Sequence, residues 1–458
     1  MVKQCRWMMA IFLGGIALSA PGALAERPLD VLQRTYGEHL SRNDPLAMPM
    51  KLRSLVADEY GLWRGGKDLF FHWCQSHCDA WLQDTDATMT LHGDQHLGNI
   101  GTYLIDPRTG ELAFGMVDFD DSHRMPFMFE LLQGVVTVRL TARENGIELG
   151  GEELRGLVDR MLADYRAAAL SDQTTTKLLQ SDSLVAKLLA GPPRRDFAKE
   201  LKHYTDQDGK LVERIVTKKG VVKEILRPAE QMRDSMARGL AEALAHSPGM
   251  SQRFAYADEK SIRAGILDIG LRTRVGSAGS QGLKKYFVLM RKPLVGVQSD
   301  VIVYVKQEVP SAAERVGLIA KDGRNPGQRC ANDMDELCRP RPVFNSWCRM
   351  GNESYWVTIR EPWTNELDPE AIKDLKTLEA AARIWSVAGG ATHRQPREVT
   401  AIRQRAGGML SRELLELSDA YLGQLTSDLS ALREDARVAE MVRTAEQRIN
   451  NAQVPPAP

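Results

Sequence analysis

The sequence predicts an α+β protein of two lobes, a mostly helical large lobe and a small lobe built on an antiparallel β-sheet. Residues 26–60 and 127–170 carry apolar side chains at spacings of three and four, as amphipathic helices do. Residues 266–308 are instead rich in β-branched residues and interrupted by glycine, and residues 354–363 form one more strand-like segment. The helical spacing returns after residue 366, so the β-rich segment lies inside an otherwise helical chain.

Composition excludes several classes of protein. The chain has 458 residues, of which 43% are hydrophobic and 26% charged, which is typical of a globular protein with enough core for two or three lobes. Lys+Arg and Asp+Glu number 60 each, and no long basic stripe stands out. An electrostatic polyanion binder is therefore not expected, and we predict no nucleic-acid partner.

Residues 1–25 have the organisation of a secretory signal peptide. Lys3 and Arg6 supply the positive start, Met8–Ala20 is mostly apolar, and Ala23–Ala25 matches an A-x-A cleavage site. An uncleaved anchor is the less favoured alternative, because the apolar stretch is short for a membrane span and is broken by glycine and proline. We expect cleavage after Ala25, a periplasmic or secreted protein, and no stable membrane insertion.

The remaining chain divides by composition. We expect a helical lobe with the chemistry-bearing loops, a β-rich lobe, C-terminal helices and a disordered tail, at residues 26–265, 266–365, 366–450 and 451–458. A polar stretch in the first of these, residues 171–225, ends in a predicted hairpin at 210–226.

Cysteine usage agrees only partly with export. Five cysteines remain after cleavage, namely Cys74, Cys78, Cys330, Cys338 and Cys348, and an odd number leaves at least one outside any intramolecular disulfide. The last three are close enough in sequence for a local disulfide. Cys74 and Cys78 lie one helical turn apart. Helix packing or a disulfide is favoured there over a metal site with His72 and His77, because the spacing is not a standard zinc pattern.

The most informative string is HGDQHLGN at residues 92–99, followed by DFDD at 118–121. A loop that holds Asp94 and Asn99, with Asp118 arriving from a strand end, offers the oxygen ligands that suit Mg²⁺. Phosphoryl transfer needs one carboxylate to orient a hydroxyl, and an amide with a second carboxylate to hold metal on the phosphates. The alternative is a polar turn whose carboxylates cap helices.

A phosphate-binding loop and a positioned lysine also occur, later in the chain. Residues 274–282 are rich in glycine and serine, and the small residues let backbone N–H groups approach an anion; they are Gly276, Ser277, Gly279, Ser280 and Gly282. Lys306 ends the strand-like run 303–306, and Glu314 is the candidate partner of its ammonium. Each feature alone is weak, because glycine-serine loops are usually hairpins and strand lysines usually face solvent.

The two motifs at 92–99 and 118–120 resemble the catalytic loop and metal-binding Asp of the protein-kinase-like superfamily, in the form seen in aminoglycoside phosphotransferases. The resemblance implies that Asp94 is the catalytic base and that Asn99 and Asp118 are metal ligands. Asp120 stands where the motif usually has glycine, and we include it with the metal ligands. The implied cofactors are Mg²⁺ or Mn²⁺ and ATP or another nucleotide, bound by the glycine-serine loop, Lys306, Glu314 and Arg64.

The order of these parts differs from that of ordinary kinases, in which the glycine-rich lobe precedes the catalytic loop. A circular permutation would account for the difference. Residues 266–365 would be the small lobe, and residues 354–363 its last strand and linker. The helix at 382–394 would be the one that normally runs into the catalytic loop.

The sequence also resembles, over most of its length, a bacterial family known as domain of unknown function 2252. The matching elements are Trp63-Arg64-Gly65, Gly93-Asp94-x-His96, Asp118-Phe119-Asp120, the glycine-serine loop, Lys306 and Ile359-Arg360-Glu361. The family's usual N-F-G is Asn99-Ile100-Gly101 here, and its Ala-His-Ala-Arg is Ala391-Thr392-His393-Arg394. The second departure leaves the role of His393 open, and the resemblance supports the fold more than an activity.

Two arginines have alternative roles. Arg64, between an aromatic residue and glycine, could clamp a phosphate or pair with Asp118 or Asp121. Arg360, at a strand end, is expected to be structural.

Three functions remain. The first is a phosphotransferase that moves a phosphoryl group from a Mg-nucleotide to a small-molecule or protein hydroxyl. The second is a metal-dependent phosphohydrolase that uses His92, Asp94, His96, Asp118, Asp120, Asp121 and His123. The third is a pseudokinase that binds a phosphorylated ligand or a partner protein without turnover. The glycine-serine loop and Lys306 favour the first and third, provided that Lys306 lies within about one side-chain length of Asp118.

Overall fold

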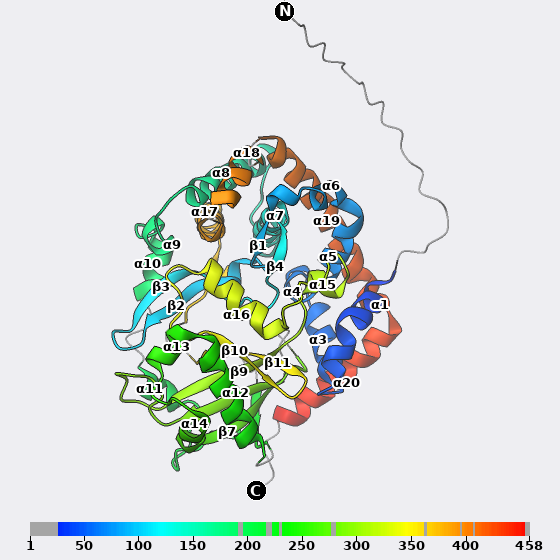
Figure 1. Cartoon of the computed structure of the whole chain (residues 1–458). Coiled ribbons are helices and arrows are strands. Elements are labelled where there is room, and N and C mark those ends of the chain that lie inside the picture. The colour runs from blue at the N-terminus through cyan, green and yellow to red at the C-terminus, as the bar shows by residue number, and fades with distance from the viewer. Residues whose placement is uncertain are drawn as a thin grey trace, which may run out of the picture.

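A seven-stranded antiparallel sheet lies against a larger body of helices, so the fold is mixed α+β (Figure 1). The computed structural model describes residues 26–190, 196–216, 222–228, 231–275, 281–360, 364–393, 396–405 and 408–453. The expected signal peptide, four of the five glycine-serine loop residues and the last residues of the expected tail lie outside these ranges.

The large sheet has the order β10-β11-β9-β8-β7-β6-β5, with every neighbouring pair antiparallel. Its strands are β5 (Arg214–Val216), β6 (Val222–Leu226), β7 (Ile266–Val275), β8 (Lys285–Met290), β9 (Val301–Glu308), β10 (Ser346–Met350) and β11 (Glu353–Ile359). The predicted hairpin at 210–226 supplies β5 and β6. The sheet therefore begins before residue 266, where the sequence placed the boundary, because β6 pairs with β7.

Both faces of this sheet are covered. On one face, Tyr286, Val288 and Val303 belong to a buried cluster together with Met236 and Leu240 of α12. The covering helices here are α12 (Met232–His246), α13 (Pro248–Arg253) and α14 (Glu259–Gly265). On the other face, Phe287 and Ile302 pack with Tyr204, which follows α11 (Phe197–Leu201). The alternation of side chains along a strand thus sends successive residues into two separate cores.

The helical body is centred on α7 (Met128–Glu144), α8 (Gly151–Ala169), α17 (Leu375–Thr392) and α19 (Gly408–Glu434). Glycine lets these helices approach closely. A Cβ at Gly134 of α7 would lie 2.2 Å from the Trp385 ring of α17, and one at Gly390 would lie 2.2 Å from the Tyr165 carbonyl oxygen of α8.

The remaining elements surround this body. The N-terminal ones are α1 (Pro28–Leu32), the π-helical turn η1 (Gln33–Gly37), α2 (Glu38–Ser41), α3 (Ala47–Leu55), α4 (Glu59–Gly65), α5 (Lys67–His77), α6 (Asp79–Leu82) and η2 (Thr85–Ala87). There are also two small two-stranded antiparallel sheets. One pairs β1 (Thr88–Leu91) with β4 (His123–Pro126), and the other pairs β2 (Ile100–Asp106) with β3 (Glu111–Met116). The others are η3 (Leu97–Asn99), α9 (Thr175–Leu178), α10 (Ser183–Ala190), α15 (Ala312–Arg315), α16 (Pro326–Leu337), η4 (Pro369–Ala371), α18 (Pro396–Arg405) and α20 (Ala436–Gln453). The last helix extends past residue 450, where the sequence placed the start of a disordered tail.

The cysteines differ from expectation. All five in the described part of the chain are buried free thiols, so the local disulfide expected among Cys330, Cys338 and Cys348 is not formed. Cys74 and Cys78 pack in the main core, as favoured. His77 stacks on Trp73 at 4.3 Å between ring centroids instead of facing a metal.

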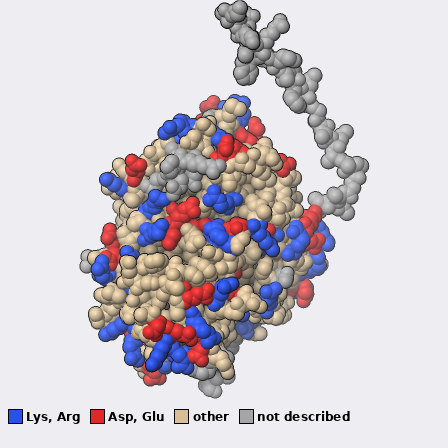
Figure 2. Space-filling model, in the orientation of Figure 1, with Lys and Arg blue, Asp and Glu red and all other residues tan. Residues whose placement is uncertain are grey.

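Lys, Arg, Asp and Glu are interspersed over the face shown in Figure 2. Within the described ranges, no helix has the length and apolar character needed to cross a bilayer.

The contact between α7 and α17 predicts opposite effects of two Gly-to-Ala changes. Gly134→Ala should lower the free energy of unfolding by about 1–3 kcal/mol, because the new methyl group overlaps the Trp385 ring. Gly423→Ala, in α19 with nothing within 4 Å of its Cβ position, should raise it by about 0.5–1 kcal/mol. Denaturant unfolding measures both, and equal effects would contradict the close packing of the two helices.

Candidate functional site

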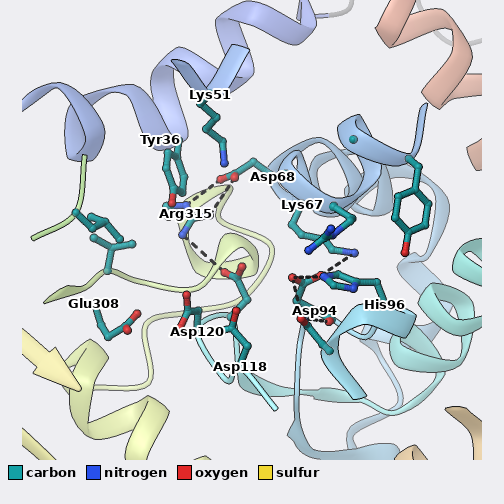
Figure 3. Close-up of a pocket in the computed structure, with 18 of the residues that line it drawn as sticks. Tyr36, Lys51, Lys67, Asp68, Asp94, His96, Asp118, Asp120, Glu308 and Arg315 are labelled. Carbon is teal, nitrogen blue, oxygen red and sulfur yellow. Dashed lines mark hydrogen bonds and ion pairs between the residues drawn. The ribbon is translucent and has the colours of Figure 1, made fainter. Parts of the chain in front are cut away.

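A polar cavity of about 630 Å³ lies between the sheet and the helical body. We call it the cleft. Charged side chains dominate its wall, and they come from the N-terminal helices, the 92–99 loop, the 118–121 segment and the sheet (Figure 3). The members used below are Tyr36, Lys51, Arg64, Lys67, Asp68, Asp94, His96, Asn99, Asp118, Asp120, Asp121, Glu308, Arg315 and Arg360. The cleft therefore brings together residues that the sequence separates by more than two hundred positions.

Side chains of α7 hold the 92–99 loop through hydrogen bonds to its backbone. Glu130 accepts a hydrogen bond from the Gly93 backbone N–H (2.9 Å), and Gln133 accepts one from the Gln95 backbone N–H (2.9 Å) while donating to the Gly93 carbonyl (3.0 Å). Gly93 has φ +85°, and a Cβ there would lie 1.9 Å from the Asp121 carbonyl oxygen. Only glycine fits this position, which brings the loop against the DFDD segment.

Asp94 is the loop residue that faces the cleft. Its Oδ1 lies 3.0 Å from the Lys67 ammonium, and its Oδ2 lies 3.6 Å from His96 Nε2. Asn99 donates to both the Asp94 carbonyl (2.9 Å) and Oδ2 (3.2 Å). Burial favours the neutral acid, but Lys67 and His96 outweigh it and lower the pKa of Asp94 to about 2. Asp94 is therefore ionised at neutral pH and can accept a hydrogen bond from a ligand hydroxyl.

Asp118 has a backbone conformation that is rare for residues other than glycine. Its φ is +66°, and its side chain is 55% exposed at the cleft. Aspartate tolerates this region better than most residues, and such outliers cluster at functional sites. The preceding strand β3 and the buried Phe119 fix the backbone on either side, so the Asp118 carboxylate is turned to the open space.

Lys306 is the point at which the sheet meets the DFDD segment. Its ammonium forms an ion pair with Asp120 and lies 3.5 Å from both Asp118 Oδ1 and Glu308 Oε1. Burial opposes the ammonium charge, but the surrounding carboxylates outweigh it and raise the pKa of Lys306 above its ordinary value. Burial and the nearby Asp120 charge raise the pKa of Glu308 above its ordinary value.

Arg329 of α16 fixes the backbone of the same segment. It is 1% exposed and donates to the carbonyls of Ser122, Asp120 (2.7 Å) and Val309 (3.0 Å). A single buried guanidinium thus joins the DFDD segment to the chain that follows β9. Its donors are directed at carbonyl oxygens, so it positions the site without entering it.

A second buried ion pair closes the upper wall of the cleft. Arg315 of α15 contacts Asp68 of α5 through two hydrogen bonds of 2.9 Å, one to each carboxylate oxygen. The same guanidinium lies 3.8 Å from Asp121, whose Oδ1 accepts the Ala312 backbone N–H (2.8 Å). Burial raises the pKa of Asp121, and Arg315 opposes that rise.

The residues named from sequence are placed as follows. Asp94, Asn99, Asp118, Asp120 and Arg64 line the cleft, and Lys306 reaches Asp118 and Asp120 there. Gly276, Ser277, Gly279 and Ser280 lie outside the described residues. Gly282 is described, but it packs against the N-terminal segment, where a Cβ would lie 2.4 Å from the Leu40 carbonyl oxygen.

Glu314 is not the partner of Lys306. It closes a capping box at the start of α15, where its carboxylate accepts the Ser311 backbone N–H (3.0 Å). Glu308 takes the expected place because it lies two residues after Lys306 on β9, and alternate residues share a face of a strand. The Ser311-x-x-Glu314 pattern is itself a capping-box signal that could have indicated this role.

Arg64 is exposed at the cleft and forms no ion pair with Asp118, Asp121 or any other residue in the described part of the chain. Of its two alternatives, the structure therefore contains only the one that leaves the guanidinium available to a ligand. Arg360 also lines the cleft and lies 3.3 Å from Glu200, in keeping with a structural ion pair.

The histidines are divided between cleft and core. His96 lines the cleft, but His92 and His123 are buried with ring nitrogens 2.8 Å and 2.7 Å from the Val117 and Asp121 carbonyls. His393, whose role was open, is fully buried and contacts Tyr165 (2.5 Å) and the Thr90 carbonyl (3.1 Å). It supports the base of the site without reaching the cleft.

Only some of the predicted metal ligands are placed so that they could bind a divalent cation. Across the described ranges, no group of three or more His, Cys, Asp or Glu side chains is arranged to hold a metal ion. Mg²⁺ sites that also use substrate phosphates need only one or two protein carboxylates. The Asp118 carboxylate and the Asn99 amide oxygen suit that arrangement, whereas the Asp120 carboxylate is taken by Lys306.

Sequence reasoning missed Lys67, Glu308, Arg329 and Glu130. Lys67 follows Gly65-Gly66 at the start of α5, and its ammonium lies 3.3 Å from the Trp63 ring centroid as well as beside Asp94. The string Trp63–Lys67 could have indicated it. Arg329 and Glu130 lie within helices and carry no local signal.

Comparison with known proteins gives one family. The sequence model described as "Uncharacterized protein conserved in bacteria (DUF2252)" matches residues 42–435. No curated protein and no solved structure matches the chain significantly. The matched range includes every described site residue named above except Tyr36.

Removing the Lys306 ammonium should destabilise the protein strongly at neutral pH. Lys306→Met leaves the Asp118 and Asp120 carboxylates without their cation, at an expected cost of about 3–5 kcal/mol in the free energy of unfolding. The deficit should shrink as the pH falls, because burial raises the pKa of Asp120 and a protonated Asp120 needs no cation. The control is Lys284→Met, whose partner Glu353 is partly exposed, at about 1 kcal/mol or less. A deficit equal to the control would contradict the role of Lys306 as the cation that offsets Asp118 and Asp120.

Glu130 should make stability depend on pH. Burial raises its pKa to about 8 from an ordinary value of 4.5. Because the folded-state pKa is raised, the contribution of Glu130 to the free energy of unfolding is fully present below pH 4.5. It is lost as the pH rises from 4.5 through 8. Relative to Glu130→Gln, which stays neutral, the wild type should lose about 2–4 kcal/mol across this window. Parallel thermal denaturation from pH 5 to 8 measures the difference, and a constant difference would show that Glu130 does not titrate there.

Proposed function

The chain belongs to the bacterial DUF2252 family, and from the cleft we propose that it is a kinase-like phosphotransferase. It would move a phosphoryl group from a Mg-nucleotide to a hydroxyl of a small molecule or a protein. The observation that carries the proposal is the meeting of Lys306 with Asp118, at 3.5 Å, in the cleft that Asp94 and Asn99 also line. Lysine, two carboxylates and an amide are the groups that phosphoryl transfer requires.

Each residue has a distinct proposed role. Ionised Asp94 would accept a hydrogen bond from the acceptor hydroxyl and orient its oxygen toward the phosphorus. With a pKa of about 2, Asp94 is a weak base, so it would act mainly by orientation until the proton is released late in the transfer. Lys67 would keep Asp94 ionised, and the Lys306 ammonium and the Arg64 guanidinium would contact phosphate oxygens.

Asn99 and Asp118 would hold the divalent cation, Mg²⁺ or Mn²⁺, which supplies charge neutralisation on the phosphate oxygens. Asp120 is better suited to hold Lys306 than to bind the cation, because their ion pair is the shortest contact of that ammonium. We keep ATP or another nucleotide as the proposed donor. The proposed location stays periplasmic or secreted, after cleavage of residues 1–25.

The connectivity supports a permuted kinase-like order. Residues 365–367, which follow β11 in the sequence, lie beside β2. The Leu367 N–H donates to the Ile100 carbonyl and the Thr102 N–H donates to the Asn365 carbonyl, both at 2.9 Å. A Cβ at Gly101 would lie 2.4 Å from that Asn365 oxygen. The end of the sheet lobe thus lies next to the strand that follows the 92–99 loop, as a linker between two kinase-like lobes would.

The alternatives have unequal support. A metal-dependent phosphohydrolase would need His92 and His123 at the cleft, and both are committed to backbone carbonyls. A pseudokinase has a specific observation in its favour, because Lys306 is already surrounded by carboxylates and Asp94 is weakly basic. Binding without turnover is therefore the second candidate.

The test combines binding and turnover. Saturating Mg-ATP, or another nucleotide in its place, should raise the Tm of the chain from residue 26 onward by about 2–4 °C. The rise should be lost in Asp118→Asn. Asp94→Asn should keep the rise and lose phosphoryl transfer by about a hundredfold or more.

The matched control is Asp159→Asn, a change at an exposed position of α8 that should alter neither quantity. Binding by the wild type without transfer to any hydroxyl acceptor would favour the pseudokinase. Absence of any nucleotide-dependent shift would contradict both proposals.

A further inference from the structure

Lys51 is a buried cation that the proposed chemistry does not use. It projects from α3 and is 5% exposed, and its ammonium lines the cleft. Figure 3 shows it pointing toward Asp68 and Arg315. Its ammonium lies over the face of Tyr36, at 4.2 Å from the ring centroid. Among the residues that the structure describes, none forms a hydrogen bond or an ion pair with it.

The carboxylates near Lys51 are already engaged. Both oxygens of Asp68 accept hydrogen bonds from Arg315 at 2.9 Å. Asp121 lies beyond Arg315, and its Oδ1 accepts the Ala312 backbone N–H. This end of the cleft therefore has two cations, Lys51 and Arg315, around the single carboxylate of Asp68, with Asp121 on the far side of the guanidinium.

A buried charge without a partner is unfavourable, and proteins normally pair it. Burial lowers the pKa of Lys51 to about 8, so most of the side chain still carries its charge at pH 7. The interaction with Tyr36 compensates only part of the lost hydration. An anion in the cleft would supply the missing partner.

The position of Lys51 is fixed by its surroundings. α3 is packed on its outer side by α20, where Met50 and Ala445 form a small buried cluster with Leu46 and Ile449. Arg448 of α20 also lies 3.1 Å from Glu224 of β6. The lysine is thus presented to the cleft by a helix that is held against both parts of the molecule, as a binding residue requires.

We propose that Lys51 is a second anion-binding point of the cleft, which holds a phosphate or carboxylate group of the substrate at the end formed by Asp68 and Arg315. This rests on the proposed function only in taking the cleft as the substrate site. It implies a ligand with an anionic group beyond the transferred phosphoryl group, such as a longer phosphate chain or an acidic acceptor.

Direct binding of simple anions tests the proposal without turnover. Calorimetric titration at pH 7, with EDTA to remove divalent cations, would use orthophosphate, pyrophosphate, tripolyphosphate and malonate as probes. Lys51→Met should raise the Kd of the bound probes by about tenfold or more, whereas Lys51→Arg, which keeps the charge, should change it by less than about threefold. Lys260→Met, at an exposed position of α14, should leave it unchanged.

Folding of the variant is checked in the same experiment. Lys51→Met replaces an unpaired buried charge by an apolar chain of similar length, so its Tm without ligand should equal or exceed that of the wild type. A phosphate probe that binds where malonate does not would identify a phosphate group, and the reverse would identify a carboxylate.

Equal Kd values for the wild type and Lys51→Met, or no binding of any probe by the wild type, would overturn the proposal. Failure of nucleotide turnover with a Lys51-dependent anion affinity would instead contradict only the phosphotransferase.

Discussion

The arrangement of the cleft depends on the ion pairs of Lys306. Asp118 and Asp120 come from the helical body, and their like charges repel each other at the cleft. The ammonium that offsets them belongs to β9 of the large sheet. Docking of the sheet on the helical body and formation of the site are therefore the same event, since either part alone would leave buried charge unpaired at a cost of several kcal/mol.

A second layer of contacts explains why the reacting groups are held in place. Arg329 binds three carbonyls around the DFDD segment, and Glu130 and Gln133 bind the backbone of the 92–99 loop. These side chains satisfy backbone groups of irregular segments that would otherwise be buried without partners. The loops are thus as well anchored as regular structure, although neither is a helix or a strand over its whole length.

The sequence predicted the site residues that lie in short local motifs. Asp94, Asn99 and Asp118 lie in short motifs whose spacing reflects one loop and one strand end, and Lys306 lies on a strand that its β-branched composition indicated. Partners from elsewhere in the chain carried no such signal, because Arg329 and Glu130 look like any charged residue on a helix until the helix is placed. Glu314 was wrongly assigned as the partner of Lys306. Its carboxylate instead accepts hydrogen bonds in the capping box at the start of α15. The same limit applies to the fold: the strands were recognisable, but the pairing of β6 with β7 that enlarges the sheet was not.

The neighbours of the carboxyl groups around the cleft shift their pKa values in opposite directions. Asp94 has a lowered pKa because Lys67 and His96 outweigh burial, whereas Glu308 has a raised pKa because burial and Asp120 outweigh Lys306. Such opposed shifts within one cavity favour the ionised form of Asp94 and the protonated form of Glu308. In the proposed function, an acceptor hydroxyl would meet the ionised Asp94, while phosphate oxygens would meet cations at Lys306 and Lys51. Under that proposal, the charges of the cleft would favour one orientation of an elongated anionic substrate, before any specific contact to its remaining atoms is considered.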